Sequence, residues 1–260
     1  MKKVVLSATA LICGAIMVAQ TNNSDVLSQG NGNASVVTQT GTLNDSDVDQ
    51  IGNGNDSDVS QLGTSNISQV NQGEANYPSY SAISTVDQDG IGNISWVGQW
   101  DTDGFSDVDQ IGDGNDAYLY QWGVDNSSVV YQDGDRNDSD VYQGNHVWTQ
   151  NNSSDVNQTG DDNISWVQQD GDNSTSTVDQ DGNDNDSDVN QSGDLQTSIV
   201  TQNGFAINMS DVDQSGLGHM STVNQQGDTN HSWVTQTGDT HTSDVQQLGD
   251  MNTSTVTQSN

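Results

Sequence analysis

The chain alternates polar and apolar positions in a short pattern that recurs about every eleven residues. The pattern is Ser-x-Val-x-Gln, and clean copies end at glutamines such as Gln50 and Gln61. An alternation with a period of two is typical of a β-strand, in which the serine, the valine and the glutamine point to one face. With the glutamine as anchor, and with Gln29 and Gln150 included, the sequence contains 22 modules. The pattern therefore predicts a row of short strands of one kind.

The residues between the strands are typical of tight turns. Glycine stands two positions after the anchor in 16 modules, and asparagine is common five positions after it. Both residues tolerate a positive φ. A strand of about five residues and a turn of about six reverse the chain, so two modules, or 22 residues, close one flat coil. The sequence therefore predicts an all-β fold: a β-solenoid of about eleven rungs, roughly 50 Å long, in which two parallel sheets enclose a narrow Ser/Val/Gln core.

Stacked coils would place each anchor glutamine on an identical glutamine one rung away. Their amides can then form a hydrogen-bonded ladder. Such a ladder satisfies buried polar groups that would otherwise cost about 1–3 kcal/mol each. We expect the core of self-assembly to consist of ladder glutamines and the valines two positions before them: Gln50, Gln61, Gln110, Gln121, Gln180, Gln191, Gln236, Gln247, Gln258, Val48, Val59, Val189, Val234, Val245 and Val256.

Composition narrows the class of protein. Only 29% of the residues are hydrophobic, and 37 acidic residues against 3 basic ones give a net charge of -34. An enzyme domain of this length usually needs close to half of its residues apolar, so the sequence argues against an enzyme. The charge also argues against nucleic acid and anionic membrane as partners.

The first residues differ from the rest of the chain. Lys2 and Lys3 precede an apolar run that ends at Ala19, and the sequence turns polar at Gln20. This pattern is typical of a bacterial secretory signal peptide, so we expect a leader over residues 1–19 and a repeat domain over 20–260. Cys13, the one cysteine, lies in the leader. The expected product is a secreted, extracellular protein without disulfides.

The repeat resembles that of a known family. From Gln50 to Gln61 the chain reads Gln-x-Gly-x-x-Asn-x-Ser-x-Val-x-Gln. This unit is similar to the curlin repeat of bacterial curli amyloid subunits, in which a small residue, usually alanine, occupies the serine position. The resemblance implies a cell-surface fibre of the biofilm matrix that serves adhesion. It also implies self-association as the main contact, with a curli nucleator subunit and the curli secretion channel as further partners.

Interruptions of the repeat indicate irregular turns. Five extra residues between Gln72 and Gln88 include Pro78, which cannot donate to a strand ladder, so a protruding turn is expected there. Around Gln150 the steps shrink to seven and eight residues, so we expect tightened turns.

The sequence contains few candidate catalytic or metal-binding residues. The histidines belong to no nucleophile, zinc or phosphate motif, although His219 and His241 are 22 residues apart and should stack on adjacent rungs. No cofactor is expected. The one alternative is calcium, for which Asp179, Asp181, Asp184 and Asp186 offer oxygen ligands without the spacing of an EF-hand.

Alternative functions remain open at this point. One is a monomeric secreted β-solenoid that binds calcium, ice or a surface glycan. Trp96, Trp166 and Trp233, three positions before their anchors, should face outward and could stack on sugars or on a neighbouring fibre. A β-helix enzyme that acts on polysaccharides is disfavoured, because no clustered pair of acids interrupts the repeat.

Overall fold

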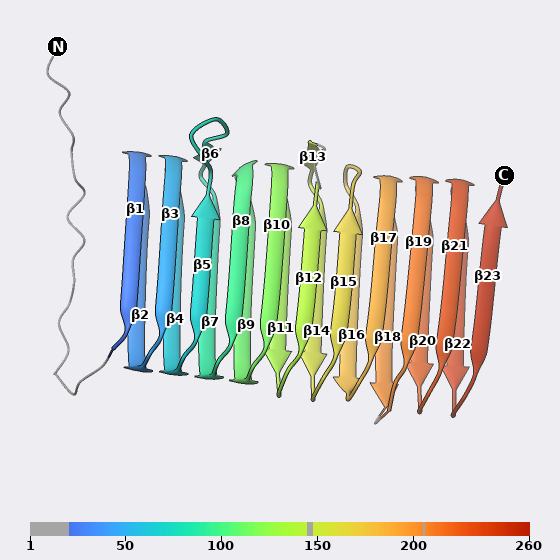
Figure 1. Cartoon of the computed structure of the whole chain (residues 1–260). Helices are drawn as coiled ribbons and strands as arrows, with labels where there is room; N and C mark the ends of the chain where they lie inside the picture. Colours follow the sequence, from blue (N-terminus) through green and yellow to red (C-terminus); the bar gives the residue numbers. More distant parts are fainter. Residues whose placement is uncertain (1–20, 145–147, 205) are drawn as a thin grey trace, which may run out of the picture.

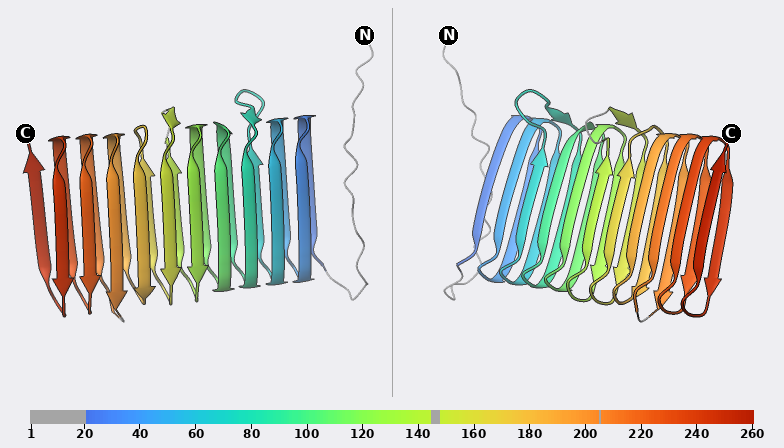
Figure 2. Two further views of the ribbon diagram at one scale, coloured as in Figure 1. Left: turned by 180° about the vertical axis from the view of Figure 1, so that it is seen from behind. Right: turned by 45° about the vertical axis from the view of Figure 1, so that its right-hand side comes forward.

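The fold is a flat stack of β-coils. The computed structural model describes residues 21–144, 148–204 and 206–260. The predicted leader, residues 1–19, lies outside the described residues. Two sheets face each other over the whole length of the stack, and the chain passes from one to the other at every turn (Figure 1 and Figure 2). The described residues contain no helix that is long and apolar enough to cross a membrane.

The first sheet contains eleven long strands. They are β1 (Asn23–Asn31), β3 (Asp45–Asn53), β5 (Ile67–Gln72), β8 (Ile94–Thr102), β10 (Asp116–Val124), β12 (Asp138–Gln143), β15 (Ile164–Gln169), β17 (Asp186–Asp194), β19 (Met209–Leu217), β21 (His231–Asp239) and β23 (Thr253–Ser259).

The second sheet contains ten long strands, which alternate with those of the first along the chain. They are β2 (Ala34–Thr42), β4 (Asp56–Thr64), β7 (Ile83–Ile91), β9 (Phe105–Asp113), β11 (Ser127–Asp133), β14 (Ser153–Thr159), β16 (Thr175–Gly182), β18 (Thr197–Gly204), β20 (Met220–Gln226) and β22 (Thr242–Leu248).

Every pairing between neighbouring strands is parallel and in register. In the first sheet, for example, Ser46 lies beside Ser68 and Val48 beside Val70, 22 residues further on. Along the interior strands, buried and more exposed residues alternate, as in β3 and β9. The predicted all-β solenoid with two parallel sheets and 22-residue coils is confirmed.

The core between the sheets is one residue thick on each side and largely valine. Nineteen buried apolar side chains form a single cluster, and all of them are valines except Ala117 and Leu119. Serines and glutamines on either side of each valine complete the inward face. So thin a core needs few apolar residues, which explains how a chain of this composition can fold.

Two insertions form short extra strands without breaking the stack. β6 (Ser79–Tyr80) pairs with Gly52 and Asn53 of β3, and β13 (Thr149–Gln150) pairs with Gly123 and Val124 of β10. Both lie at the same edge of the solenoid (Figure 1). The first insertion confirms the expected protruding turn.

Two of the 22 expected anchor glutamines were wrong, and one of them removes a module. Gln150 is exposed and lies in the insertion, so the segment from Gln143 to Gln158 is one lengthened module and not two shortened ones. Gln29 pairs with Ile51, and Ser28 takes the ladder position beside Gln50. The described residues therefore contain 21 modules.

Candidate self-assembly core

The glutamines form two continuous ladders, one in each sheet. Each Nε2 donates to the Oε1 of the glutamine in the next coil, as in Gln110 to Gln132 at 2.9 Å and Gln121 to Gln143 at 2.9 Å. The ladder in the first sheet runs through Gln50, Gln72, Gln99, Gln121, Gln143, Gln169, Gln191, Gln214, Gln236 and Gln258. The ladder in the second sheet runs through Gln39, Gln61, Gln88, Gln110, Gln132, Gln158, Gln180, Gln202, Gln225 and Gln247.

Each ladder amide also reaches across the core to the opposite sheet. Gln39 donates from Nε2 to the carbonyl oxygen of Asn23 at 2.7 Å, and Gln110 donates to that of Ile94 at 2.9 Å. Both Nε2 hydrogens and the Oε1 of an interior glutamine are therefore occupied. The amides tie each coil to the next and the two sheets to each other, which fixes the register of the stack.

All fifteen residues of the expected core take part in this arrangement. The nine glutamines make ladder bonds, and Val48, Val59 and Val189 are fully buried. Val256 and Gln258 are only partly buried because they belong to β23, which has one neighbouring strand among the described residues. The part of all fifteen residues in self-assembly stays a prediction.

The serines four positions before the glutamines differ from them in hydrogen bonding. Buried serine hydroxyls such as Ser57 and Ser106 have no hydrogen-bond partner among the described residues. Only small residues occupy this position in the buried strands, and in β10 it is Ala117, which pairs with Ser139. The serines therefore fill space, and their hydroxyls add no ladder of their own.

Glycine two positions after the anchor is required by the contact between coils. At Gly90 the backbone has φ +142, and a Cβ would lie 1.8 Å from the carbonyl oxygen of Gly112 in the next coil. The same contact recurs at Gly41, Gly63 and Gly182. Any side chain would push neighbouring coils apart.

The asparagine five positions after the anchor does not adopt the positive φ expected of it. The residue before it does, as at Leu43 (φ 61) and Asp184 (φ 56). The asparagine is buried instead and forms a further ladder: Asn66 N–H donates to Asn44 Oδ1 at 3.0 Å, and Asn66 Nδ2 donates to the carbonyl oxygen of Leu62 at 3.1 Å.

The two edges of the solenoid differ in this position. Turns that lead from the second sheet to the first carry asparagine throughout: Asn44, Asn66, Asn93, Asn115, Asn137, Asn163, Asn185, Asn208, Asn230 and Asn252. Asn22 has the same position before β1. Turns that lead from the first sheet to the second vary: Asn33, Asn55, Ala82, Gly104, Asn126, Asn152, Ser174, Gln196, His219 and His241.

His219 replaces an asparagine of the ladder bond for bond. Its Nδ1 accepts from the His241 N–H at 3.2 Å, so its Nε2 must carry the hydrogen that bonds the carbonyl oxygen of Ser215 at 3.1 Å. The two imidazoles are parallel, with centroids 5.2 Å apart, as the 22-residue spacing predicted. In this bonding pattern the ring accepts and donates where an asparagine amide would.

This substitution can be tested directly. His219→Asn should leave the midpoint of chemical denaturation nearly unchanged, because the amide restores both bonds. His219→Phe should lower the free energy of unfolding by about 1–3 kcal/mol, since it leaves a buried N–H and a carbonyl unpaired. Equal loss in the two variants would contradict the amide-like role of His219.

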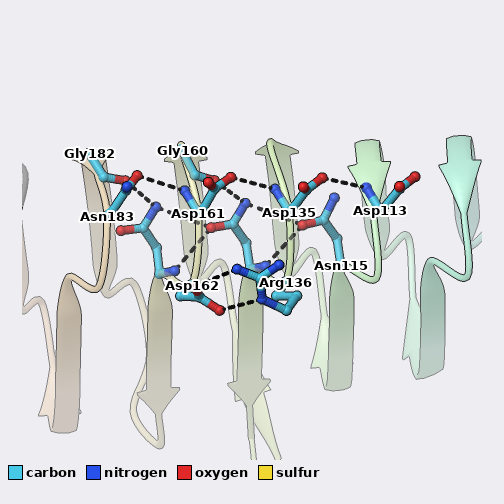
Figure 3. A network of polar contacts seen from close by, with 11 residues as sticks. Asp113, Asn115, Asp135, Arg136, Gly160, Asp161, Asp162, Gly182 and Asn183 are labelled. Carbon is cyan, nitrogen blue, oxygen red and sulfur yellow. Dashed lines mark hydrogen bonds and ion pairs between the residues drawn. The ribbon is translucent and has the colours of Figure 1, made fainter.

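Acidic turn residues act as acceptors for backbone amides. Asp113, Asp135 and Asp161 lie in a row along the stack, one in each successive coil, at the edge shown in Figure 3. Asp113 N–H donates to Asp135 Oδ1 and Asp135 N–H to Asp161 Oδ1, each at 3.0 Å. A bidentate pair between Arg136 and Asp162, both 2.7 Å, lies beside them. Arg136 is 61% exposed, so this pair adds little stability.

The four aspartates of the calcium hypothesis lie on different parts of a coil. Asp179 and Asp181 are on β16, Asp184 is in the following turn, and Asp186 begins β17 in the other sheet. In the part of the chain that the structure describes, no group of three or more His, Cys, Asp or Glu side chains is placed to hold a metal ion.

Six aromatic side chains gather on the outer face of the first sheet. They belong to β8, β10, β12 and β15, and we call them the aromatic cluster: Trp96, Trp100, Tyr118, Tyr120, Tyr142 and Trp166. Trp96 stacks on Tyr118 with a centroid distance of 4.3 Å, so this face of the indole is already covered. Trp233 is outside the cluster and lies near His231.

Gly98 makes room for the cluster. A Cβ there would lie 2.3 Å from Trp96 and 2.4 Å from Trp100. Sequence reasoning missed Gly98, because a glycine in the outward row of a strand has no periodic signal.

The carboxylate of Asp140, on β12 beside the aromatic cluster, is in an unfavourable electrostatic environment. Burial raises the pKa of Asp140 to about 6, with Asp138 and Asp116 adding to the shift. At neutral pH the folded chain therefore holds this carboxylate in a less favourable setting than water provides.

The sign of the pH effect follows from this shift. The folded pKa lies above the ordinary value of 3.8, so between about pH 4 and 6 the folded state binds the proton more tightly than the unfolded state. Stability should rise as the pH falls from 7 to 5, by about 1 kcal/mol for Asp140 once solvent screening is allowed for.

Denaturation at pH 7.5 and pH 5 would measure this gain. Asp140→Asn should stabilise the chain at pH 7.5 and reduce the difference between the two conditions. The matched variant Asp244→Asn, in the same outward position of an exposed strand, should reduce it less. A larger effect at Asp244 would contradict the assignment.

Comparison with known families agrees with this geometry. Residues 30–63, 112–144 and 233–259 match the family described as the curlin associated repeat. Each matched segment covers two or more consecutive strands with their turns. The chain carries curlin repeats. Curlin repeats belong to a family of structural amyloid subunits, not of enzymes. No curated protein matches the chain.

The curlin-repeat assignment explains which contacts recur. The matched segments include ladder glutamines, stacked glycines and edge asparagines, all of which touch the equivalent residue of the next coil. Recurrence along the chain therefore reflects contact between coils.

Proposed function

We propose that this curlin-repeat protein is secreted and self-assembles end to end into an extracellular, curli-like amyloid fibre that serves adhesion in a biofilm matrix. Residues 1–19 would direct its export and be removed. A nucleator subunit and a secretion channel of the curli type would be its other partners. The curlin repeat supports the fibre, and the leader pattern supports secretion.

The observation that carries the proposal is the state of the two ends of the stack. Within the described residues, β1 and β2 at one end and β22 and β23 at the other each pair with a single strand. Unpaired strand edges are templates for further strands. The ladders are open as well: Gln258 donates to no further glutamine, and Gln39 accepts from none, among the described residues.

The alternative of a monomeric ligand-binding solenoid has less support. An ice-binding face needs regular rows of threonine, whereas the outward row of the second sheet reads Asp155, Thr177, Ile199, Thr222 and Asp244. The described residues offer no gathered calcium ligands.

Fibre formation tests the proposal. The purified chain should form fibres with cross-β reflections near 4.7 and 10 Å. Gln258→Ala should slow elongation, because an incoming strand loses an amide partner at the open edge. Thr257→Ala, the outward neighbour on β23, should elongate almost as the unchanged chain does. A chain that stays monomeric at tens of micromolar in salt would contradict the proposal, and equal effects of the two substitutions would contradict the role of the ladder.

A further inference from the structure

The 21 long strands make ten and a half coils, and this half coil restricts how two copies can join. The described stack begins with β1 and ends with β23, and both strands belong to the first sheet. Gln39 of β2 bonds the carbonyl oxygen of Asn23 in β1, and Gln50 of β3 bonds that of Ala34 in β2 in the same way. Each step along the chain therefore climbs the same height, which is half a rung. Both ends therefore present the first sheet half a rung beyond the second.

Two end-to-end arrangements have to be compared. If copies stack without rotation, β1 of the incoming copy pairs with β23. The second sheet then has a gap between β22 and the incoming β2 that is two rungs high, or about 9.6 Å, where one strand is missing. One edge at each end stays unpaired.

A half turn about the stack axis removes this gap. The incoming β1 then pairs with β22, and the incoming β2 pairs with β23. Both edges are filled at the ordinary spacing, because the first sheet of one copy continues the second sheet of the other.

The two sheets are equivalent enough for this exchange. Gln39 in the second sheet and Gln50 in the first both donate to the carbonyl oxygen of the residue 16 positions earlier, across the core, at 2.7 and 2.6 Å. Each step from one module to the next therefore repeats the same contact. A half turn between copies only continues the half turn between modules.

The glutamine ladders distinguish the arrangements. In the half-turn arrangement Gln258 faces Gln39 of the incoming copy, so the bond seen from Gln39 to Gln61 is repeated across the junction. Without rotation Gln258 faces Ser28, the one ladder position among the described residues that lacks an amide, and Gln39 has no partner.

The hydrogen bonds between turn residues of successive coils also favour the half-turn arrangement. At the C-terminal end His241 Nδ1 and Asn252 Oδ1 accept no hydrogen bond from a further coil of the described chain. In the half-turn arrangement the backbone N–H of the incoming Asn22 lies one rung above His241, and that of the incoming Asn33 lies one rung above Asn252. Without rotation only the Asn252 acceptor is reached.

We propose that successive copies join head to tail with a half turn about the stack axis, β1 on β22 and β2 on β23. The inference rests on the proposed end-to-end assembly and specifies its partner surface, which is a second copy of this chain. The aromatic cluster then faces opposite sides in successive copies, and the fibre repeats after every second copy.

Paired cysteines in fibres test this register. In a Cys13→Ser background, Thr255→Cys with Val36→Cys would place two thiols on neighbouring strands only in the half-turn arrangement. Thr255→Cys with Asp25→Cys would do so only without rotation. All three residues are outward and exposed. A bifunctional thiol reagent with a reach of about 4.8 Å is added to preformed fibres, which are then dissolved and sized on a denaturing gel.

We expect a ladder of covalent multimers from the Val36 pair and monomers from the Asp25 pair. The single variant Thr255→Cys shows how much dimer comes from contacts between fibres. The reverse pattern, or fibres in which neither pair exceeds that background, would overturn the half turn and leave end-to-end assembly standing. If the unchanged chain forms no fibres, the proposed function and this inference fail together.

Discussion

Replacing Gly90 with alanine should destabilise the solenoid by more than about 3 kcal/mol, enough to disrupt the coils around it. The added Cβ would lie 1.8 Å from the carbonyl oxygen of Gly112 and 2.7 Å from its carbonyl carbon. Both atoms belong to the backbone of a paired strand, so neither can move without breaking the ladder. The φ of +142 adds conformational strain for any side chain. The midpoint of chemical denaturation would measure the loss.

Gly92, two residues later, is the matched control. Its φ is +72, and apart from its chain neighbours no atom of the described residues lies within 4 Å of a Cβ placed there. Equivalent turns of other modules carry Leu43 and Ser65 at φ 61. Gly92→Ala should therefore cost only about 1–2 kcal/mol, the ordinary penalty of a left-handed residue. Similar losses in the two variants would show that contact between coils is not what requires Gly90.

The second large effect is expected at an interior ladder glutamine. Gln110 accepts from Gln88 at 2.8 Å and donates to Gln132 and to the Ile94 carbonyl oxygen, both at 2.9 Å. Gln110→Ala removes all three bonds and leaves a cavity in a core that is fully buried there. We expect a loss of about 3–5 kcal/mol in the free energy of unfolding, measured by chemical denaturation.

Ser106 on the same strand provides the comparison. Its hydroxyl is buried with no hydrogen-bond partner among the described residues, and Ala117 already occupies the corresponding position of another module. Ser106→Ala should leave stability unchanged or raise it by up to about 1 kcal/mol. If Ser106→Ala destabilises as much as Gln110→Ala, the hydroxyl has an essential partner and the distinction between the two rows is wrong.

The strands were predictable because their pattern depends on one strand alone. Alternating Ser, Val and Gln define an inward face, and the eleven-residue step defines a coil, so two parallel sheets could be predicted without knowing any contact. Gln29 and Gln150 were wrongly taken as anchors because they are glutamines, although their distances from the neighbouring anchors are not eleven residues. Steps of ten, seven and eight residues marked both as outside the ladder.

The turns were less predictable because their contacts lie between coils. Asparagine is common both at positive φ and in ladders, and the sequence does not distinguish these uses. The structure does: Asn66 is buried and bonded to Asn44, while Ser65 before it takes the positive φ. The sequence also did not predict that His219 makes the hydrogen bonds of a turn asparagine. The spacing of His219 and His241 did correctly predict that they stack.

The unequal length of the strand pairs has a mechanical consequence. A tensile load along the stack pulls directly against the bonds between coils, and the weakest boundary yields first. β8 and β10 pair over nine residues, but β12 and β15 pair over six. Each coil that opens releases 22 residues, about 75 Å of extended chain in place of about 4.8 Å of stack. Under force the molecule should lengthen in steps that begin near β12 and β15, so a stretched chain absorbs work before it breaks.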